Sequence, residues 1–223
     1  MLDTVRMRLT QIADSVKSNG WKSVIKEVVF LRRKAVFVEK DLSEVVERPE
    51  PLAGSKLKLL EFDKDMLTSG TFHFAVANRR LKAMHYLKEG LGGFALVQDN
   101  VVVGDFWYFA SKATDDPSVL HPDLRRFGFK SWVKSEVYTF DIFVAPAERK
   151  NGVSAAFQNN ALLPLRAKGF TKAYGFYMAD NIPAMWCTRV TNKWKELRSA
   201  SVSRFFIFMK VVPLQKARAD SKG

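Results

Sequence analysis

Cysteine, histidine and long apolar runs are scarce in this chain of 223 residues. A single cysteine, Cys187, excludes an internal disulfide framework and is typical of a reducing compartment. The first residues lack the apolar core of a secretory signal, and no run of about 18 apolar residues is present. The three histidines, His73, His85 and His121, lack the cysteine or acidic spacing of a metal site. We therefore expect a cytoplasmic protein without a metal or a membrane span.

Acidic residues are also few, 23 against 36 basic ones, which gives a net charge of +13. Such a surface favours anionic partners, among them the phosphates of coenzyme A (CoA), acyl carrier protein, nucleic acid or an anionic bilayer. No nucleic-acid recognition motif accompanies the charge, so nucleic acid is not an expected partner. With 47% hydrophobic residues, the chain is long enough for one domain with an appendage.

The N-terminal segment has apolar residues at steps of three and four, from Leu2 to Val16 and again from Trp21 to Val29. Asn19-Gly20 separates the two runs, and the basic residues 32–34 end the second. This pattern predicts a basic amphipathic helical hairpin. The hairpin docks on its own domain, or residues 2–34 contact the inner face of a membrane as a peripheral anchor.

The domain organisation expected from composition has three parts. Residues 1–50 form the helical extension with a short strand at 35–38 and a proline-rich linker near Pro49. Residues 51–215 form the main domain, and residues 216–223 form a disordered tail.

Apolar periodicity then orders the elements of the main domain. It predicts strand 57–62, helical segments within 65–87, a hairpin of strands 93–97 and 101–109, a surface loop at 113–130, strand 137–144, helix 154–168, strand 172–178, helix 183–190 and a closing strand 202–212. Pro164 should kink the first long helix or end its first half.

The most informative unit is the strand, loop and helix between residues 137 and 168. Its loop is Glu148-Arg149-Lys150-Asn151-Gly152-Val153-Ser154. Several backbone N–H groups, two cations and a helix N-terminus come together there, which is a physical basis for binding a pyrophosphate. Gly152 lets the backbone approach the phosphate, and Ser154 caps the helix or donates to a phosphate oxygen.

The same residues resemble motif A of the GNAT (GCN5-related N-acetyltransferase) superfamily. The strand ends in Val144-Ala145-Pro146, and Arg149, Gly152 and Ser154 take the family's three loop positions, with Ser in place of a smaller residue. Residues 179–184, which include Asn181, are similar to the start of motif B. The resemblance covers about residues 56–212.

This resemblance implies an α/β (α+β) fold with a mixed, mostly antiparallel sheet, splayed between its fourth and fifth strands and flanked by helices. An acyl-CoA, either acetyl-CoA or a longer one, would lie in the gap and act as the acyl donor. The cofactor-binding residues that the resemblance implies are Phe143, Val144, Arg149, Lys150, Asn151, Gly152, Val153, Ser154 and Asn181.

For catalysis the resemblance implies direct attack of an amine on the thioester, helped by a base and an acid. Carboxylates near the fourth strand are candidate bases: we prefer Glu136, with Asp141 and Asp105 as rivals and Tyr138 between the first two. Thr188 stands where the family has the tyrosine that serves as general acid, so Tyr177 or a water would donate the proton to the departing thiolate. The neighbouring Cys187 is expected to pack as a small apolar residue.

Three functions follow from these observations. The first is an N-acyltransferase, with acetyl as the expected group and an unidentified amine as acceptor. The second is transfer of a longer chain from acyl-CoA or acyl carrier protein to a lipid-like acceptor, which the basic surface favours. The third is a degenerate GNAT module that binds without catalysis.

Overall fold

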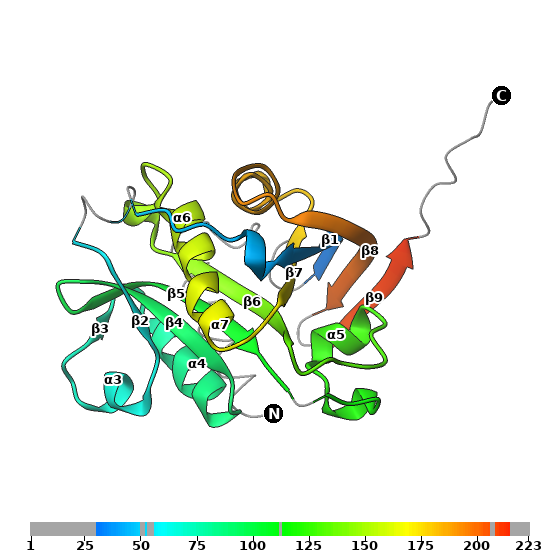
Figure 1. Cartoon of the computed structure of the whole chain (residues 1–223), viewed down its shortest axis with the longest axis horizontal. Coiled ribbons are helices and arrows are strands. Elements are labelled where there is room, and N and C mark those ends of the chain that lie inside the picture. The colour runs from blue at the N-terminus through cyan, green and yellow to red at the C-terminus, as the bar shows by residue number, and fades with distance from the viewer. Residues whose placement is uncertain (1–29, 50–51, 53–55, 112, 206–207, 215–223) are drawn as a thin grey trace.

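The structure is a computed structural model of the whole chain, and it describes residues 30–49, 52, 56–111, 113–205 and 208–214. Within these ranges the backbone forms one nine-stranded sheet with helices on both faces (Figure 1). The strand order is β2 (Lys58–Glu61), β4 (Gly92–Gln98), β5 (Val101–Phe109), β6 (Glu136–Val144), β7 (Lys172–Met178), β1 (Phe30–Asp41), β8 (Lys195–Phe205) and β9 (Phe208–Leu214), while β3 (His73–Phe74) pairs with β5.

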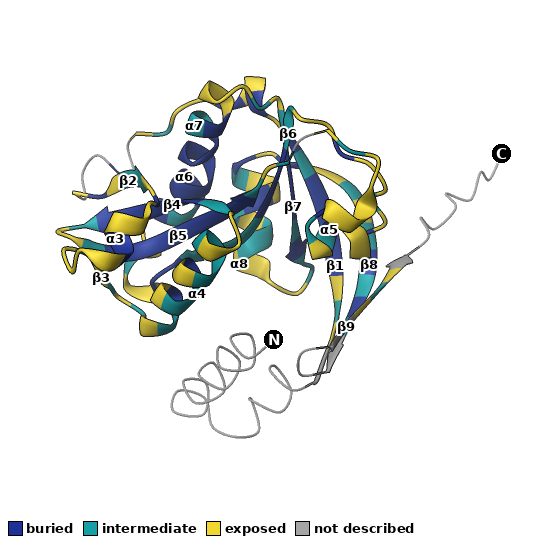
Figure 2. Ribbon diagram, turned by 90° about the horizontal axis from the view of Figure 1, so that it is seen from below, coloured by how far each residue is buried: buried dark blue, intermediate teal, exposed yellow. Residues whose placement is uncertain are grey.

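The sheet is mixed and mostly antiparallel, as predicted. Only the β6–β7 and β3–β5 pairs are parallel among the described strands. Figure 2 shows α6 (Val153–Asn160) and α7 (Leu162–Ala167) on one face, with α3 (Lys64–Thr68) and α4 (Ala77–Lys88) on the other. The remaining helices are short: η2 (Leu42–Glu44), η3 (Pro117–Val119), α5 (Pro122–Arg126), η4 (Pro146–Glu148), α8 (Ile182–Met185) and the π-helix η5 (Trp186–Thr191).

Alternation along the strands divides the apolar residues between the two faces. In β1, Val36 and Val38 join the core beneath α6 and α7. Ala35 and Phe37 join an aromatic core on the opposite face, beneath α5. A third core lies under α3 and α4. Because helices and loops cover both faces, the central strands are apolar on both sides.

The β4–β5 hairpin is confirmed. Asp99 and Asn100 connect the strands with φ angles of 45° and 66°. Two successive left-handed residues are typical of the tight hairpin turn that matches the strand twist, and Asn and Asp tolerate this conformation. The helix predicted at 154–168 is also found, in two halves that meet at Ala161. Pro164 lies in the first turn of α7, where its missing N–H costs little.

Strand β1 corrects the predicted extension. The basic residues Arg32, Arg33 and Lys34 belong to this strand, not to a helix, and β1 lies in the sheet between β7 and β8. The boundary drawn at residue 50 therefore does not separate residues 30–41 from the main fold. Residues 35–38, which were predicted as a short strand, are buried on both faces, as a strand inside a covered sheet requires. The rest of the predicted hairpin, residues 2–29, and the predicted tail at 216–223 lie outside the described residues.

Several other boundaries differ from the prediction. Residues 65–87 form α3, β3 and α4, because Ser69-Gly70, with Gly70 at φ 73°, ends the first helix. The helix predicted at 183–190 divides into α8 and η5. The closing strand is instead the antiparallel pair β8 and β9. Within the predicted loop 113–130, helix α5 forms, and Leu124 is buried.

Candidate active site

The β6–β7 pair separates after a short ladder. Glu136, Val137 and Tyr138 pair with residues 172–174, and beyond this point the two strands have no paired residues. At the apex, the Thr139 hydroxyl donates to the Tyr174 carbonyl at 3.0 Å. A Cβ on Gly175 would lie 3.0 Å from Thr139 Oγ1, so the glycine allows this close approach. The predicted splay is therefore confirmed.

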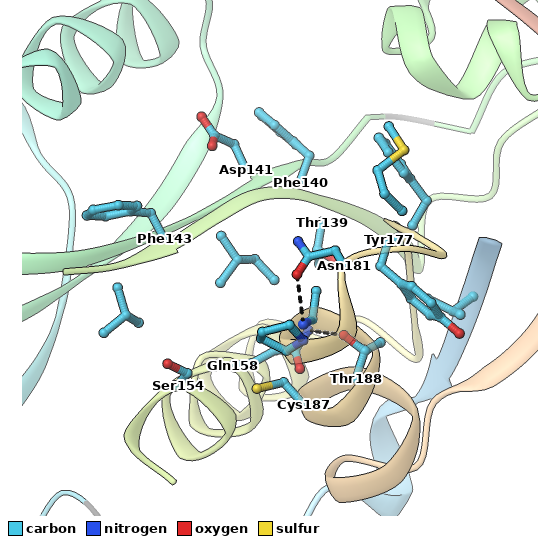
Figure 3. A pocket seen from close by; sticks show the side chains of 18 of the residues that line it. Thr139, Phe140, Asp141, Phe143, Ser154, Gln158, Tyr177, Asn181, Cys187 and Thr188 are labelled. Atoms are coloured by element: carbon cyan, nitrogen blue, oxygen red, sulfur yellow. Dashed lines mark hydrogen bonds between the residues drawn. The ribbon is translucent and has the colours of Figure 1, made fainter. Parts of the chain in front are cut away.

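A cavity of about 520 Å³ occupies the gap (Figure 3). Its walls are the separated edges of β6 and β7, with α6, α8 and η5 on one face of the sheet and α4 and α5 on the other. Its lining includes Lys82, Tyr86, Asp123, Thr139, Phe140, Asp141, Phe143, Val144, Arg149, Ser154, Gln158, Gly175, Tyr177, Asn181, Cys187, Thr188 and Trp194. The cavity thus connects the two faces of the sheet.

The loop between β6 and α6 lies at the mouth of this cavity. Arg149 Nε donates to the Val144 carbonyl at 2.8 Å, which fastens the loop to the end of β6. Gly152 has φ 78°, and nothing lies within 4 Å of where its Cβ would be. In the described part of the chain, the N–H groups of Gly152 and Ser154 have no hydrogen-bond partner. Exposed Lys150 adds a cation, so the loop has the donors that an anion requires.

The predicted cofactor-binding residues lie in three different settings. Phe143, Val144, Arg149, Ser154 and Asn181 line the cavity. Lys150, Asn151 and Gly152 are exposed on the loop, whereas the Val153 side chain is buried in the core beneath α6. Asn181 Oδ1 accepts the Ala184 N–H at 3.2 Å and so caps α8. Because the Val153 side chain is buried, this residue could contribute to binding only through its backbone.

A bulge in β6 brings Asp141 into the cavity wall. The β5–β6 register shifts between Asp105 and Trp107, and Asp141 adopts φ 45°, which a non-glycine residue rarely does. Three residues of α4 hold its carboxylate: Lys82 with Nζ at 2.9 Å, Tyr86 with its hydroxyl at 2.8 Å, and Arg79. The bulge is thus fixed by side chains from the neighbouring helix.

Arg79 joins this bulge to a second buried carboxylate. It donates to Asp141 Oδ1 at 3.0 Å and holds Asp105 through two contacts, one of them from Nε at 2.8 Å. Trp107 Nε1 also donates to Asp105 at 2.8 Å. Burial alone would lower the pKa of Arg79. The two carboxylates, Asp105 and Asp141, outweigh burial, so the pKa is raised. The two cations and two carboxylates of this cluster, Arg79, Lys82, Asp105 and Asp141, cancel in charge.

Asp141 is consequently a poor base. Burial alone would raise its pKa, but the charges of Lys82 and Arg79 hold the pKa well below its usual range. Burial raises the pKa of Asp105, and this carboxylate is fully engaged by Arg79 and Trp107. Both carboxylates serve to position β5, β6 and α4.

Two predicted catalytic residues lie away from the cavity. Glu136 is in the paired part of β6, and its carboxylate accepts from the Tyr174 hydroxyl at 3.0 Å. Tyr138 is fully buried in the aromatic core, with its hydroxyl 3.3 Å from Asp123 Oδ2. The structure therefore brings neither side chain to the cavity.

Tyr177 lines the cavity, yet its hydroxyl donates to Glu196 Oε1 at 2.5 Å. Burial and this contact raise the pKa of Tyr177 to about 12. Its proton is therefore held by Glu196 rather than directed to the gap. Cys187 also lines the cavity, and burial raises the pKa of its thiol.

Sequence reasoning missed Asp123, which lies in the predicted surface loop. It lines the cavity on the face opposite the Arg149 loop, and Arg126 donates to its Oδ1 at 3.0 Å. The run His121-Pro122-Asp123 carries a signal that could have located it, because a proline at the first position and an acid in the first turn are typical of a helix start.

Among the described residues, no group of three or more His, Cys, Asp or Glu side chains could hold a metal ion. In the same part of the chain, no helix has the length and apolar character needed to cross a bilayer.

Comparison with known proteins identifies the architecture. No protein-family model and no curated protein matches the chain. Among solved structures, it is similar to a GCN5-related glucosamine N-acetyltransferase region of a fungal multi-domain GH3 β-N-acetylglucosaminidase, with a TM-score of 0.54 and 17% identity over 89% of this chain and 23% of that one. Similarity is weaker to GCN5-related N-acetyltransferase from Sphaerobacter thermophilus (TM-score 0.48, 11% identity, 88% and 57% covered) and to a GNAT-family acetyltransferase from Colwellia psychrerythraea (0.48, 9%, 79% and 56%).

The chain therefore spans less than a quarter of the fungal protein and little more than half of the two bacterial ones. Identity at this level establishes architecture, and only the first likeness exceeds a TM-score of 0.5. Together with the splayed β6–β7 pair and the loop at its mouth, it shows that the described part of the chain has the GNAT fold.

Proposed function

We propose that the protein is an acyl-CoA-dependent N-acyltransferase, with acetyl-CoA as the first donor to test. The observation that carries this proposal is the cavity between β6 and β7, with a cationic loop and unpaired N–H groups at its mouth. A pyrophosphate suits that loop, and an extended chain with amide groups suits the unpaired strand edges.

The residues present fit the proposed donor. Arg149, Lys150 and the N–H groups of Gly152 and Ser154 would hold the phosphates, and the edge of β6 from Thr139 onward would pair with the pantetheine arm. When bound, acyl-CoA supplies a thioester whose carbonyl is open to attack by an amine. The protein's part is to align the two reactants and to accept a proton.

We propose that Asp123 is the base that accepts the proton of the amine. It lines the acceptor side of the cavity and is held by one exposed cation, Arg126, and by the Tyr138 hydroxyl. Asp141 is held by two cations and a hydroxyl. In this proposal the amine enters between α4 and α5, loses its proton to Asp123 and would attack the thioester carbonyl in the gap. The C–N bond of the amide would form, the C–S bond would break, and the CoA thiolate would leave and take a proton from water.

Calorimetry with acetyl-CoA tests the proposal directly. We expect saturable binding that Lys150→Ala weakens by about 3- to 10-fold, the effect of losing one charged contact in a hydrated site. Lys58→Ala is the matched control, because Lys58 is an exposed cation on the distant edge strand β2. No binding of acetyl-CoA, a long-chain acyl-CoA or acyl carrier protein would refute the acyltransferase proposal.

The same measurement separates the alternatives in donor and role. A preference for the long-chain acyl-CoA or for acyl carrier protein would move the search to lipid-like acceptors. Tight binding without transfer to any member of an amine panel would identify a degenerate binding module.

A further inference from the structure

A buried line of polar side chains lies behind the cavity wall, and its hydrogen bonds run in one direction. Asn192, Gln158 and Thr188 are all less than 8% exposed. Asn192 Nδ2 donates to the Ala155 carbonyl at 3.0 Å and to Gln158 Oε1 at 2.7 Å. Gln158 Nε2 then donates to Thr188 Oγ1 at 3.1 Å, as Figure 3 shows.

The Ala155 carbonyl fixes this direction because a backbone carbonyl can only accept. Asn192 must therefore present its amide N–H₂, and Gln158 must present its oxygen to Asn192. The amide nitrogen of Gln158 is then left for Thr188. Reversing the Asn192 amide would place its oxygen against the Ala155 carbonyl, and two acceptors repel each other. In the present orientation, Asn192 Oδ1 is buried and has no hydrogen-bond partner among the described residues.

Thr188 is the last residue in this series of hydrogen bonds, and its oxygen accepts from Gln158. Its own hydroxyl hydrogen is still available to donate. In the described part of the chain this hydrogen has no acceptor, although Thr188 is only 6% exposed. A buried hydroxyl normally donates as well as accepts, because an unmet donor is costly. Thr188 and Gln158 both line the cavity, so the cavity is where an acceptor can reach the hydroxyl.

We infer that the Thr188 hydroxyl is a binding-site donor for the linear arm of the acyl donor, and that it hydrogen-bonds an uncharged acceptor on that arm. The acceptor is an amide carbonyl or the sulfur of the pantetheine group. This inference rests on the proposed function. Thr188 does not act as an acid in it, since an alcohol keeps its proton while donating a hydrogen bond.

The test is calorimetric binding of CoA to Thr188→Val, which keeps the shape and removes the donor. We expect about 3- to 10-fold weaker CoA binding, the usual value of one neutral hydrogen bond, and recovery in Thr188→Ser. Adenosine 3′,5′-bisphosphate lacks the arm, so its affinity should not change. That ligand also shows that the variant is folded.

Desulfo-CoA identifies the acceptor. If the penalty of Thr188→Val persists with desulfo-CoA, the acceptor is an amide carbonyl. If the penalty disappears, the acceptor is the sulfur.

Gln158→Glu tests the direction of this series of hydrogen bonds with Thr188 intact. A carboxylate accepts from both neighbours, so it would take the hydroxyl hydrogen of Thr188 and weaken CoA binding more than adenosine 3′,5′-bisphosphate binding. Equal CoA affinity in wild type and Thr188→Val, or failure of Thr188→Ser to recover it, would overturn the inference. Wild-type protein that binds neither ligand would instead refute the proposed function.

Discussion

Replacing Arg79 with methionine should destabilise the fold strongly, because this one side chain donates hydrogen bonds to two carboxylates. Its side chain is 7% exposed, and those of Asp105 and Asp141 are 2% and 21% exposed. Methionine fills similar space but donates nothing, so Asp105 would keep only the Trp107 N–H. Breaking a buried pair by removing one partner typically costs about 3–5 kcal/mol. Asp141 would keep Lys82, which places the expected loss near the lower end.

Urea unfolding, followed by fluorescence, measures this loss as a change in midpoint at constant slope. The double variant Arg79→Met/Asp105→Asn separates the pair from the packing. Asparagine keeps an oxygen for Trp107 Nε1 and carries no charge. We expect the double variant to recover about 2 kcal/mol or more, since coupling within one buried network commonly reaches this size.

Arg80→Met is the matched control on the same helix. Arg80 is exposed and donates to one backbone carbonyl, that of Leu67 at 2.9 Å, so its loss should cost about 1 kcal/mol or less. The reasoning is refuted if Arg79→Met costs no more than Arg80→Met, or if the double variant shows no coupling.

Three further predictions concern single residues. Burial lowers the pKa of His121 from its ordinary 6.5, so below that pH the unfolded chain takes up a proton that the folded protein does not. Stability should therefore fall as the pH drops from 7.5 to 5, by up to about 1.4 kcal/mol per pH unit, and His121→Gln should flatten this unfolding profile. Gly175→Val should weaken acetyl-CoA binding at least 10-fold in calorimetry, because its side chain meets Thr139 and enters the gap. Asp123→Asn should lower kcat by about 100-fold with little change in KM for acetyl-CoA, and an unchanged kcat would exclude it as the base.

The parts of the fold that sequence predicted are those with local signals. The β4–β5 hairpin, β7 and the loop before α6 each depend on residues close together in the chain. Of strand β1, residues 35–38 were predicted as a short strand. Its start at residues 30–34 was assigned to a helical hairpin, because its basic run follows a helical pattern and its partners lie more than 130 residues away. Only the assembled sheet makes that pattern a strand.

The same distinction applies to the site. The proposed anion-binding loop is continuous in sequence, so its composition alone could predict it. The Arg79 cluster joins residues 26 and 62 positions apart, and each carboxylate alone is an ordinary strand residue. Asp141 was a reasonable candidate base by type and position, but its three hydrogen-bonding partners come from a helix whose contact with β6 no local pattern reveals.

The separation of β6 from β7 is itself evidence for a ligand of extended shape. Each strand keeps a partner on its outer side, β5 and β1 respectively, while the facing edges diverge after Tyr138 and Tyr174. Unpaired strand edges inside a sheet are costly, and proteins ordinarily close them. Specific contacts fix the β6 side of the opening: Lys82 holds the bulge at Asp141 from α4, and the guanidinium groups of Arg79 and Arg149 lie 4.9 and 5.8 Å from the centre of the Phe143 ring. Cations thus fix the bulge of β6 and fasten the loop at the end of that strand, while the edge of β6 that faces β7 stays unpaired among the described residues. This arrangement would suit a chain whose own amide groups complete the sheet.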